Sequence, residues 1–247
     1  MLDKIINLSY VFFWEKKLYE LNLKKTLLIF FSKFWFFEMI AKKRAEKIVK
    51  KSKIEDYLQF SGSYIDIGTG FGHIIENILR NNKDKKIKFK TVDPYLQPAK
   101  KVLKRLDRSG LNNRFLFSKD SGINFLREQK DSSVDGISLF YVLHHISYPQ
   151  QEEIIREIRR VLKNKQFLFL VEDVPEDEQG FHRIEKWDRR LNCETKNDKH
   201  YYRTNIEWTD LLKKYDFRIV DQNLFLSKST KDDEGIITHG SYICKLE

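Results

Sequence analysis

The sequence predicts an α/β protein built on a doubly wound, largely parallel sheet, and three observations support this prediction. From residue 54 onward, apolar runs of strand length alternate with segments of helical periodicity, which is the pattern of βαβ units. A glycine-rich turn follows the first apolar run, and Asp93 ends the second. A strand, a tight glycine turn and a helix N-terminus together form the place where open α/β sheets hold nucleotide-like ligands.

The first 53 residues precede this alternation, and we expect a helical N-terminal extension (1–53) attached to one domain (54–247). They hold 11 of the chain's 34 aromatic side chains. Lys33 and Glu38 interrupt the apolar run at 27–40, which is therefore too short and too charged to span a bilayer. Three interpretations stay open: peripheral membrane contact through residues 1–40, a roof over a hydrophobic substrate pocket, and ordinary core packing.

The first apolar run ends at Ile67 and leads into a turn that contains Gly68, Gly70 and Gly72. A helical pattern then begins at Ile74. Glycine is needed in such a turn because a ligand can touch the backbone only where no Cβ intervenes, and because some turn positions require a positive φ.

The glycine spacing differs from that of a dinucleotide-binding turn. In G-x-G-x-x-G the third glycine lets the helix pack closely, and the helix N-terminus faces a pyrophosphate. Here that glycine comes one position early, and His73 stands in its place. The carboxylate of Asp66 beside the turn repels phosphate and suits a cation. Asp93, 21 positions after Gly72, is placed to accept both hydroxyls of a ribose.

The D-x-G-x-G-x-G pattern, with a second acid after the next strand, resembles class I S-adenosylmethionine-dependent methyltransferases. The resemblance covers the chain from Ile54 to Leu246. It implies a Rossmann-like, doubly wound sheet of seven strands in the order 3-2-1-4-5-7-6 with the last strand antiparallel. It also implies S-adenosyl-L-methionine as cofactor and S-adenosyl-L-homocysteine as product. The residues that it assigns to the methionine end and the ribose are Asp66, Gly68, Thr69, Gly70, Gly72, Asp93 and Pro94.

Two further helix–strand units lead to a third strand, expected at Phe115–Phe117. Gly110 is placed to close the helix before it, as a C-terminal glycine does. In the resembled family the acid after the third strand binds the adenine amino group and a neighbouring amide meets the ring, which implies Asp120 and Ser121. Asp120 is equally a favoured N-cap for a helix at Gly122–Arg127, and both roles stay open.

The run from Val134 to Leu143 predicts a buried central strand, because strands of parallel sheets are nearly continuously apolar. The resemblance places Phe140 and Tyr141 at its carboxyl end, beside the cofactor. His145 comes next, and it is a candidate general base because the pKa of an unperturbed histidine lies near neutrality. The alternative for His145 is a ring that packs the loop and hydrogen-bonds backbone.

The next strand, Phe167–Val171, ends at Glu172 and Asp173, which are placed to orient a substrate hydroxyl, bind a cation or cap the segment that follows them. A lid-like insertion at about 175–203 is expected over the substrate side. We take its His200 as a second candidate base. Its polar candidates for contact with a substrate are His182, Arg183, Asp188, Tyr201 and Arg203.

A capping-box spacing at Thr204 and Glu207 predicts one more helix. Two strands, expected at Phe217–Ser227 and Gly235–Leu246, then form the closing antiparallel hairpin that the resemblance implies. The net charge is +10, but Lys and Arg are scattered beside abundant acids, which favours solvated surfaces over a nucleic-acid site.

Cys193 and Cys244 are far apart and lack Cys or His at metal spacing, so a disulfide scaffold or zinc site is not expected. This favours a reducing cytoplasm, and we expect metal-independent chemistry.

The predicted function is methyl transfer from S-adenosylmethionine to a small or lipophilic acceptor, on oxygen or carbon. Enzymes that methylate nucleobase amines commonly carry a D/N-P-P-Y/F/W tetrad at the fourth strand end, where this chain has Leu139 to Val142. Two alternatives stay open: an RNA or protein methyltransferase, and a non-catalytic S-adenosylmethionine-binding module. A cytoplasmic location, peripheral at a membrane if residues 1–40 bind lipid, is expected.

Overall fold

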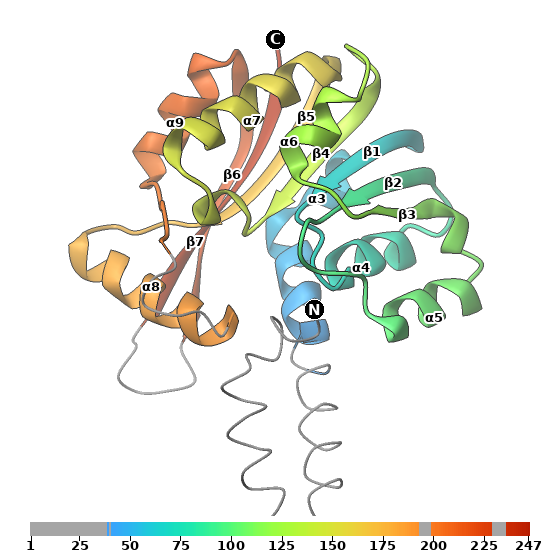
Figure 1. Ribbon diagram of the computed structural model, residues 1–247, viewed down its shortest axis with the longest axis horizontal. Helices are drawn as coiled ribbons and strands as arrows, with labels where there is room; N and C mark the ends of the chain where they lie inside the picture. The colour runs from blue at the N-terminus through green and yellow to red at the C-terminus, as the bar shows by residue number, and fades with distance from the viewer. Residues whose placement is uncertain (1–38, 40, 193–198, 229–235) are drawn as a thin grey trace, which may run out of the picture.

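The computed structural model describes residues 39, 41–192, 199–228 and 236–247 (Figure 1). Within them lies one seven-stranded sheet with the order β3-β2-β1-β4-β5-β7-β6. β7 pairs antiparallel with β5 and β6, and the pairings among β1 to β5 are parallel. The predicted fold and strand order are confirmed. The strands are β1 (Ser61–Ile67), β2 (Lys86–Val92), β3 (Phe115–Ser118), β4 (Val134–Phe140), β5 (Leu162–Asp173), β6 (Phe217–Lys228) and β7 (Ile236–Leu246).

Helices cover both faces of the sheet (Figure 1). One hydrophobic core lies under α6, α7 and α9, and a second lies under α4, α5 and the helix at 41–52. The other helices are α3 (Ile54–Tyr57), α4 (His73–Asn81), α5 (Lys100–Arg108), α6 (Gly122–Arg127), α7 (Tyr148–Val161), α8 (Glu178–Asn192) and α9 (Asn205–Lys214), with short 3-10 turns η2 (Asn112–Arg114) and η3 (Leu143–His145).

The burial pattern explains why the central strands form where they do. Every residue of β4 except Asp135 is buried, as expected for a parallel strand covered on both faces. β2 alternates exposed and buried residues until its last two positions, Thr91 and Val92, which are both buried. Because β1, β2, β4 and β5 are parallel, their carboxyl ends meet at one edge, where open α/β sheets bind their ligands.

The fourth strand is shorter than the sequence predicts, because it ends at Phe140 rather than Leu143. Tyr141 adopts a left-handed φ of +59°, which breaks the extended run. The backbone N–H groups of Val142 and Leu143 then donate to Glu172 Oε1, at 2.9 and 2.7 Å. The Glu172 carboxylate therefore accepts the N–H groups that a neighbouring strand would otherwise pair with, and the chain continues into η3.

Two predicted helix ends agree with the structure. Gly110 has a φ of +67° after α5, and Thr204 and Glu207 form the predicted capping box at α9. Ile48 and Val49 of the helix at 41–52 are buried in the core that α4 shares. Residues 1–38, which carry most of the predicted extension, lie outside the described residues, so the domain division stays a prediction. In the described part of the chain, no helix has the length and apolar character needed to cross a membrane.

Candidate active site

The turn between β1 and α4 presents bare backbone at the carboxyl edge of the sheet. φ is +72° at Gly68, +55° at Gly70 and +80° at Gly72, a region that L side chains rarely adopt. A Cβ on Gly68 would lie 2.4 Å from Val142 Cγ2, so the turn passes directly against the end of β4. Glycine at Gly68 is therefore required by both the backbone angle and the close approach.

Asp66 lies in β1 immediately before the turn and is 3% exposed. Ser138 on the neighbouring β4 donates a hydrogen bond from its hydroxyl to Asp66 Oδ1 at 2.6 Å. Burial raises the pKa of Asp66 to about 7, against the lowering effect of the Ser138 hydrogen bond, while the charge of Asp93 adds to the rise. A nearby cation favours the ionised form of such a carboxyl, so Asp66 is suited to a positively charged ligand.

Asp93, at the end of β2, ties the turn to the next loop. Its Oδ2 accepts the backbone N–H of Gly70 at 3.0 Å, and its Oδ1 accepts those of Tyr95 and Leu96 at 2.9 and 2.7 Å. Pro94 beside it is exposed. A carboxylate has about four acceptor positions, so Oδ2 retains room for a further donor such as a ribose hydroxyl. The ribose role predicted for Asp93 stays a prediction, to which the structure adds a role in shaping the turn.

These residues fit S-adenosylmethionine, the cofactor that the sequence predicts. Asp66 supplies a carboxylate for its cationic end, the glycine turn supplies approachable backbone, and Asp93 keeps an acceptor near the turn. The cofactor would be held by these three features, and its sulfonium would supply an activated methyl group.

We expect S-adenosylmethionine to bind about tenfold more tightly at about pH 8 than at about pH 6. The pKa of Asp66 lies above its usual value, so the carboxyl is largely protonated below neutral pH and ionises as the pH rises through about 7. Titration calorimetry across this range measures the effect. Asp66→Asn should bind weakly with no such dependence, and Ser138→Ala should shift the dependence to higher pH. A wild-type affinity that does not change with pH would contradict this role of Asp66.

The residues after β3 take positions that differ in part from the prediction. Ser121 is the N-cap of α6, and its hydroxyl accepts the Asn124 N–H at 3.3 Å. Asp120 Oδ1 instead accepts the Ser121 N–H at 2.7 Å. The alternative that Asp120 is the N-cap is therefore wrong, because the adjacent hydroxyl has that place. The adenine contacts predicted for Asp120 and Ser121 stay predictions.

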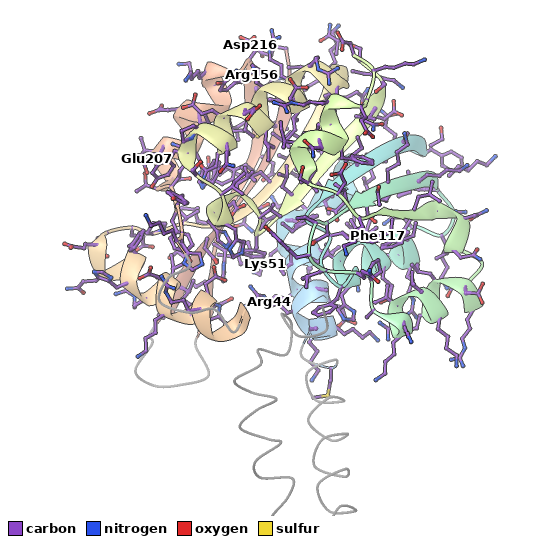
Figure 2. All side chains as sticks on the ribbon, viewed as in Figure 1. Arg44, Lys51, Phe117, Arg156, Glu207 and Asp216 are labelled. Carbon is purple, nitrogen blue, oxygen red and sulfur yellow. The ribbon has the colours of Figure 1, made fainter. Side chains whose placement is uncertain are left out.

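The end of β4 carries a strained aromatic residue. Phe140 is 7% exposed, and Tyr141 has the left-handed φ of +59° that costs a non-glycine residue on the order of 1 kcal/mol. The Tyr141 ring lies 5.1 Å from the Arg44 guanidinium and 5.5 Å from the His239 ring. Arg44 is labelled among the side chains in Figure 2. Burial raises the pKa of the Tyr141 hydroxyl, which therefore stays protonated at neutral pH.

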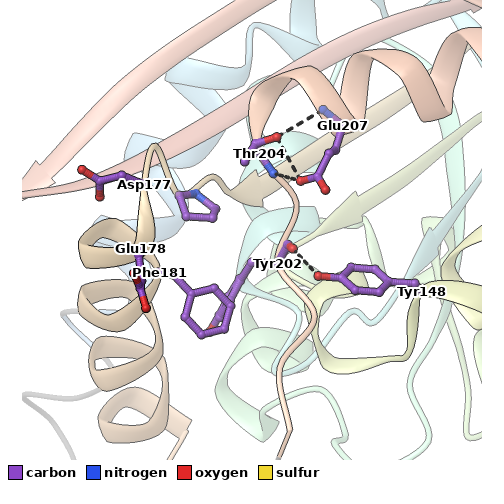
Figure 3. A pocket seen from close by; sticks show the side chains of 8 residues that line it. Tyr148, Asp177, Glu178, Phe181, Tyr202, Thr204 and Glu207 are labelled. Atoms are coloured by element: carbon purple, nitrogen blue, oxygen red, sulfur yellow. Dashed lines mark hydrogen bonds between the residues drawn. The ribbon is translucent and has the colours of Figure 1, made fainter.

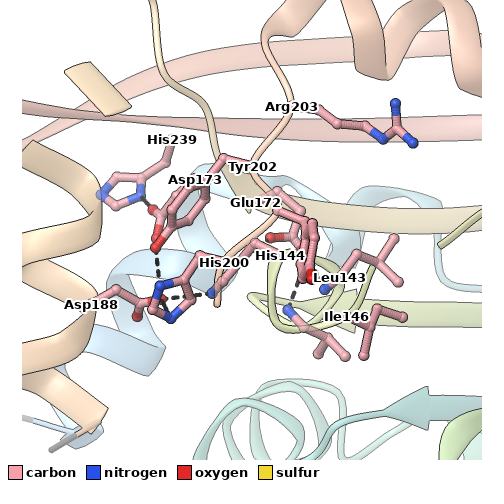
Figure 4. A network of polar contacts seen from close by, with 12 residues as sticks. Leu143, His144, Ile146, Glu172, Asp173, Asp188, His200, Tyr202, Arg203 and His239 are labelled. Carbon is pink, nitrogen blue, oxygen red and sulfur yellow. Dashed lines mark hydrogen bonds and ion pairs between the residues drawn. The ribbon is translucent and has the colours of Figure 1, made fainter. Parts of the chain in front are cut away.

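Glu172 and Asp188 enclose the buried ring of His144 (Figure 4). His144 Nδ1 lies 2.6 Å from Glu172 Oε2, and His144 Nε2 lies 2.9 Å from Asp188 Oδ2. Burial disfavours the charged ring, but the two carboxylates outweigh it and raise the pKa of His144 well above its usual value. Glu172 thus caps the start of η3 and orients a histidine, and the three roles that the sequence left open for it stay predictions.

Asp173 forms a second carboxylate–histidine pair with His239, whose Nδ1 lies 2.5 Å from Asp173 Oδ1. The two residues are register partners on β5 and β7, and they are 1% and 3% exposed. Sequence reasoning did not single out His239. Its only signal in the sequence is a histidine within a mainly apolar strand. The strand register that brings it to Asp173 depends on the tertiary structure and cannot be read from the sequence.

The insertion brings some predicted residues to the histidines and directs others elsewhere. His200 Nε2 lies 3.5 Å from Asp188 Oδ2, and the exposed His145 has its ring 5.5 Å from that of His200. The Tyr201 N–H donates to the His144 carbonyl at 2.8 Å. Arg203 donates to Gln151 Oε1 at 2.7 Å and points away from the histidines in Figure 4, so it packs the base of the insertion.

A cavity of about 300 Å³ lies between the start of α8 and the segment that precedes α9 (Figure 3). Tyr202 forms one wall, and its ring stacks against His144 at 5.0 Å on the side of the histidine cluster. None of the lining residues belongs to the glycine turn, so this cavity is distinct from the cofactor cradle. It is lined by Tyr148, Pro175, Asp177, Glu178, Phe181, Tyr202, Thr204 and Glu207. Arg183 is half-buried on α8 nearby, and its Nε atom has no hydrogen-bond partner among the described residues.

Several solved structures described as methyltransferases share this fold with the chain at low sequence identity. The Burkholderia thailandensis 1,6-didemethyltoxoflavin-N1-methyltransferase, bound to 1,6-didemethyltoxoflavin and S-adenosylhomocysteine, is 15% identical with a TM-score of 0.59, and the match covers 90% of this chain and 88% of that one. A geranyl diphosphate methyltransferase in complex with SAM is 9% identical with a TM-score of 0.60, covering 83% and 85%. A SAM-dependent methyltransferase from Methanosarcina mazei is 20% identical with a TM-score of 0.55, covering 78% and 97%.

No curated protein sequence matches the chain significantly. The family model described as a methyltransferase domain, however, matches residues 39–222, which is most of the chain. This match includes the glycine turn, both acids beside it and the ends of strands β1 to β5. The chain therefore belongs to the methyltransferase domain family, and it is a class I S-adenosylmethionine-dependent methyltransferase.

Proposed function

We propose that this methyltransferase acts on an oxygen or an acidic carbon of a small, lipophilic acceptor, with His239 as the general base. The observation that carries the proposal is the Asp173–His239 pair at the carboxyl edge of the sheet. When a carboxylate accepts the Nδ1 proton of a histidine, the lone pair of Nε2 is left to take a proton from an acceptor.

The surroundings of His239 favour a lipophilic acceptor. Its ring packs 5.1 Å from that of Phe225 and 5.5 Å from that of Tyr141, and it is almost fully buried. An aromatic, water-excluding environment favours an apolar or aromatic acceptor over a heavily hydrated one. The similar methyltransferase structures named above act on small molecules, which supports the same substrate class.

In the proposed mechanism the chain's own residues bind, orient and deprotonate the acceptor. His239 Nε2 takes the proton of an acceptor hydroxyl or acidic carbon, and the Asp173 carboxylate stabilises the positive ring that results. Tyr141, whose ring packs against that of His239, helps to orient the acceptor. Such positioning is worth about 7–11 kcal/mol of a barrier, so it is the larger contribution, with the base adding to it.

The proposal is tested by transfer of labelled methyl from S-adenosylmethionine to matched pairs of acceptors. Lipophilic phenols or hydroquinones are compared with anilines of the same carbon skeleton, and products are separated by chromatography. We expect label in the hydroxyl or carbon products. If label appears only in the anilines, the proposed acceptor atom is wrong. If label appears only in RNA or protein, the proposed substrate class is wrong.

The positive net charge is the observation that favours the second candidate, an RNA methyltransferase. That function predicts activity that falls steeply with added salt, because phosphate contacts release counterions. Activity on a neutral lipophilic acceptor should change little under the same conditions.

Peripheral membrane contact through residues 1–40 is a separate proposal, supported by the aromatic content of that segment. It is tested by vesicle co-sedimentation of the full chain and of a chain that lacks this segment.

A further inference from the structure

Three histidines from two separate segments gather around Asp188 beside the methyltransferase site, and Figure 4 labels two of them, His144 and His200. His144 and His145 come from η3, Asp188 comes from α8, and His200 precedes α9. This cluster has no part in the proposed base chemistry of His239.

The ligand atoms of His144, His145 and Asp188 all lie within 4.8 Å of one another. His144 Nε2 and Asp188 Oδ2 are 2.9 Å apart, yet Nε2 is buried and makes no well-aligned hydrogen bond to any residue that the structure describes. Two ligand atoms of one metal ion lie at a similar separation. Each is about 2.0–2.2 Å from the ion, so the two atoms are about 3 Å apart with no proton between them. Ring nitrogens with a carboxylate oxygen suit first-row divalent ions.

The residues behind this group are arranged as partners of metal ligands. His144 Nδ1 faces Glu172 Oε2 at 2.6 Å, which holds the proton on Nδ1 and directs the Nε2 lone pair toward Asp188. Glu172 is itself fixed, because its Oε1 accepts the backbone N–H groups at the start of η3. Tyr202 donates its hydroxyl to Asp188 Oδ2 at 3.0 Å. Carboxylate–histidine–metal arrangements of this kind orient the ligand and raise its basicity.

We propose that His144, His145 and Asp188 bind one divalent transition metal ion, with zinc as the ion to test first. Two histidines and one carboxylate leave a coordination position open, which is typical of zinc sites with a chemical role and of non-haem iron sites. His200 Nε2, 3.5 Å from Asp188 Oδ2, stands beside that position. The ion takes the place of a proton between His144 and Asp188. The site lies on the acceptor side of the domain, away from the cofactor cradle.

The competing interpretation is a buried ion pair in which Glu172 and Asp188 hold a protonated His144 with no ion. It explains the contacts of His144, but it does not require the exposed His145. A variant at His145 therefore separates the two interpretations, because removal of its ring weakens metal binding in the first and leaves the ion pair intact in the second.

The test uses full-length protein stripped with chelator and titrated with Zn²⁺ by calorimetry, with Co²⁺ absorption to report coordination. We expect one equivalent of tightly bound Zn²⁺ in the wild type. His145→Ala should weaken it by at least about tenfold, and Tyr202→Phe by about 10–100-fold. The control His182→Ala removes an exposed histidine of α8 outside the cluster and should bind as the wild type does.

Thermal unfolding with and without Zn²⁺ verifies that each variant is folded, since an ion that binds the native state raises Tm. Absence of saturable Zn²⁺, Fe²⁺ or Co²⁺ binding to the wild type would overturn the proposal, as would wild-type affinity in folded His145→Ala. Binding of S-adenosylmethionine and the acceptor assay are measured separately, so failure of the metal site and failure of the proposed base chemistry are distinguishable.

Discussion

His239→Asn is expected to lower kcat by about 10²–10⁴-fold, because it removes the nitrogen that takes the acceptor proton. The asparagine amide can still donate to Asp173, so the contact between β5 and β7 is preserved. The affinity for S-adenosylmethionine should not change, since His239 lies at β7 and the cofactor cradle lies at β1 and β2. Methyl transfer at saturating acceptor and cofactor, together with calorimetry of cofactor binding, measures both quantities.

Phe225→Leu is the matched control, because Phe225 packs on the His239 ring at 5.1 Å but offers no proton acceptor. It should cost less than about tenfold in kcat if proton transfer, rather than packing, is what His239 contributes. A loss of the same size in both variants would assign His239 a packing role. Undiminished kcat in His239→Asn would remove it from the mechanism.

Glu172→Gln is expected to lower the free energy of unfolding by about 3–5 kcal/mol, measured on chelator-treated protein by urea denaturation. The Glu172 carboxylate is fully buried, faces His144 Nδ1 and accepts two backbone N–H groups. Its removal leaves a buried positive ring with one partner fewer. The loss is therefore dominated by an uncompensated charge rather than by a missing contact.

Glu153→Gln provides the comparison on α7, where the partly exposed Glu153 pairs with the exposed Arg127. An exposed ion pair is worth about 0–1 kcal/mol, so this variant should unfold almost as the wild type does. Equal effects of the two substitutions would show that burial of the Glu172–His144 pair carries no special energetic weight, and the description of that network would have to change.

The glycine turn and its two acids were predictable from the sequence because they form a local pattern. Asp66 and the three glycines lie within seven residues, and the backbone angles that they need are specific to glycine. The strand order came from the family resemblance, which a single chain's periodicity would not have supplied. The Thr204 capping box was likewise recognisable from two residues at a fixed spacing.

The histidine partners were not predictable, because each pair joins segments far apart in the chain. Asp173 meets His239 only through the register of β5 on β7, and Asp188 meets His144 only when α8 folds over η3. The end of β4 was missed for a related reason. An apolar run continues to Leu143, but Glu172 supplies a better partner for its N–H groups than another strand does.

The turn at Gly68 to Gly72 is expected to hold S-adenosylmethionine between Asp66 and Asp93, and all the chemistry proposed for this chain depends on that placement. Titration calorimetry of the wild type and of Asp93→Ala with S-adenosylmethionine and S-adenosylhomocysteine tests it most directly. We predict saturable, micromolar binding of both ligands by the wild type and at least about tenfold weaker binding by a folded Asp93→Ala, since each lost hydrogen bond to a charged group costs about 1.5–3 kcal/mol. Equal affinity in the two proteins, or binding of NADH in place of S-adenosylmethionine, would contradict it.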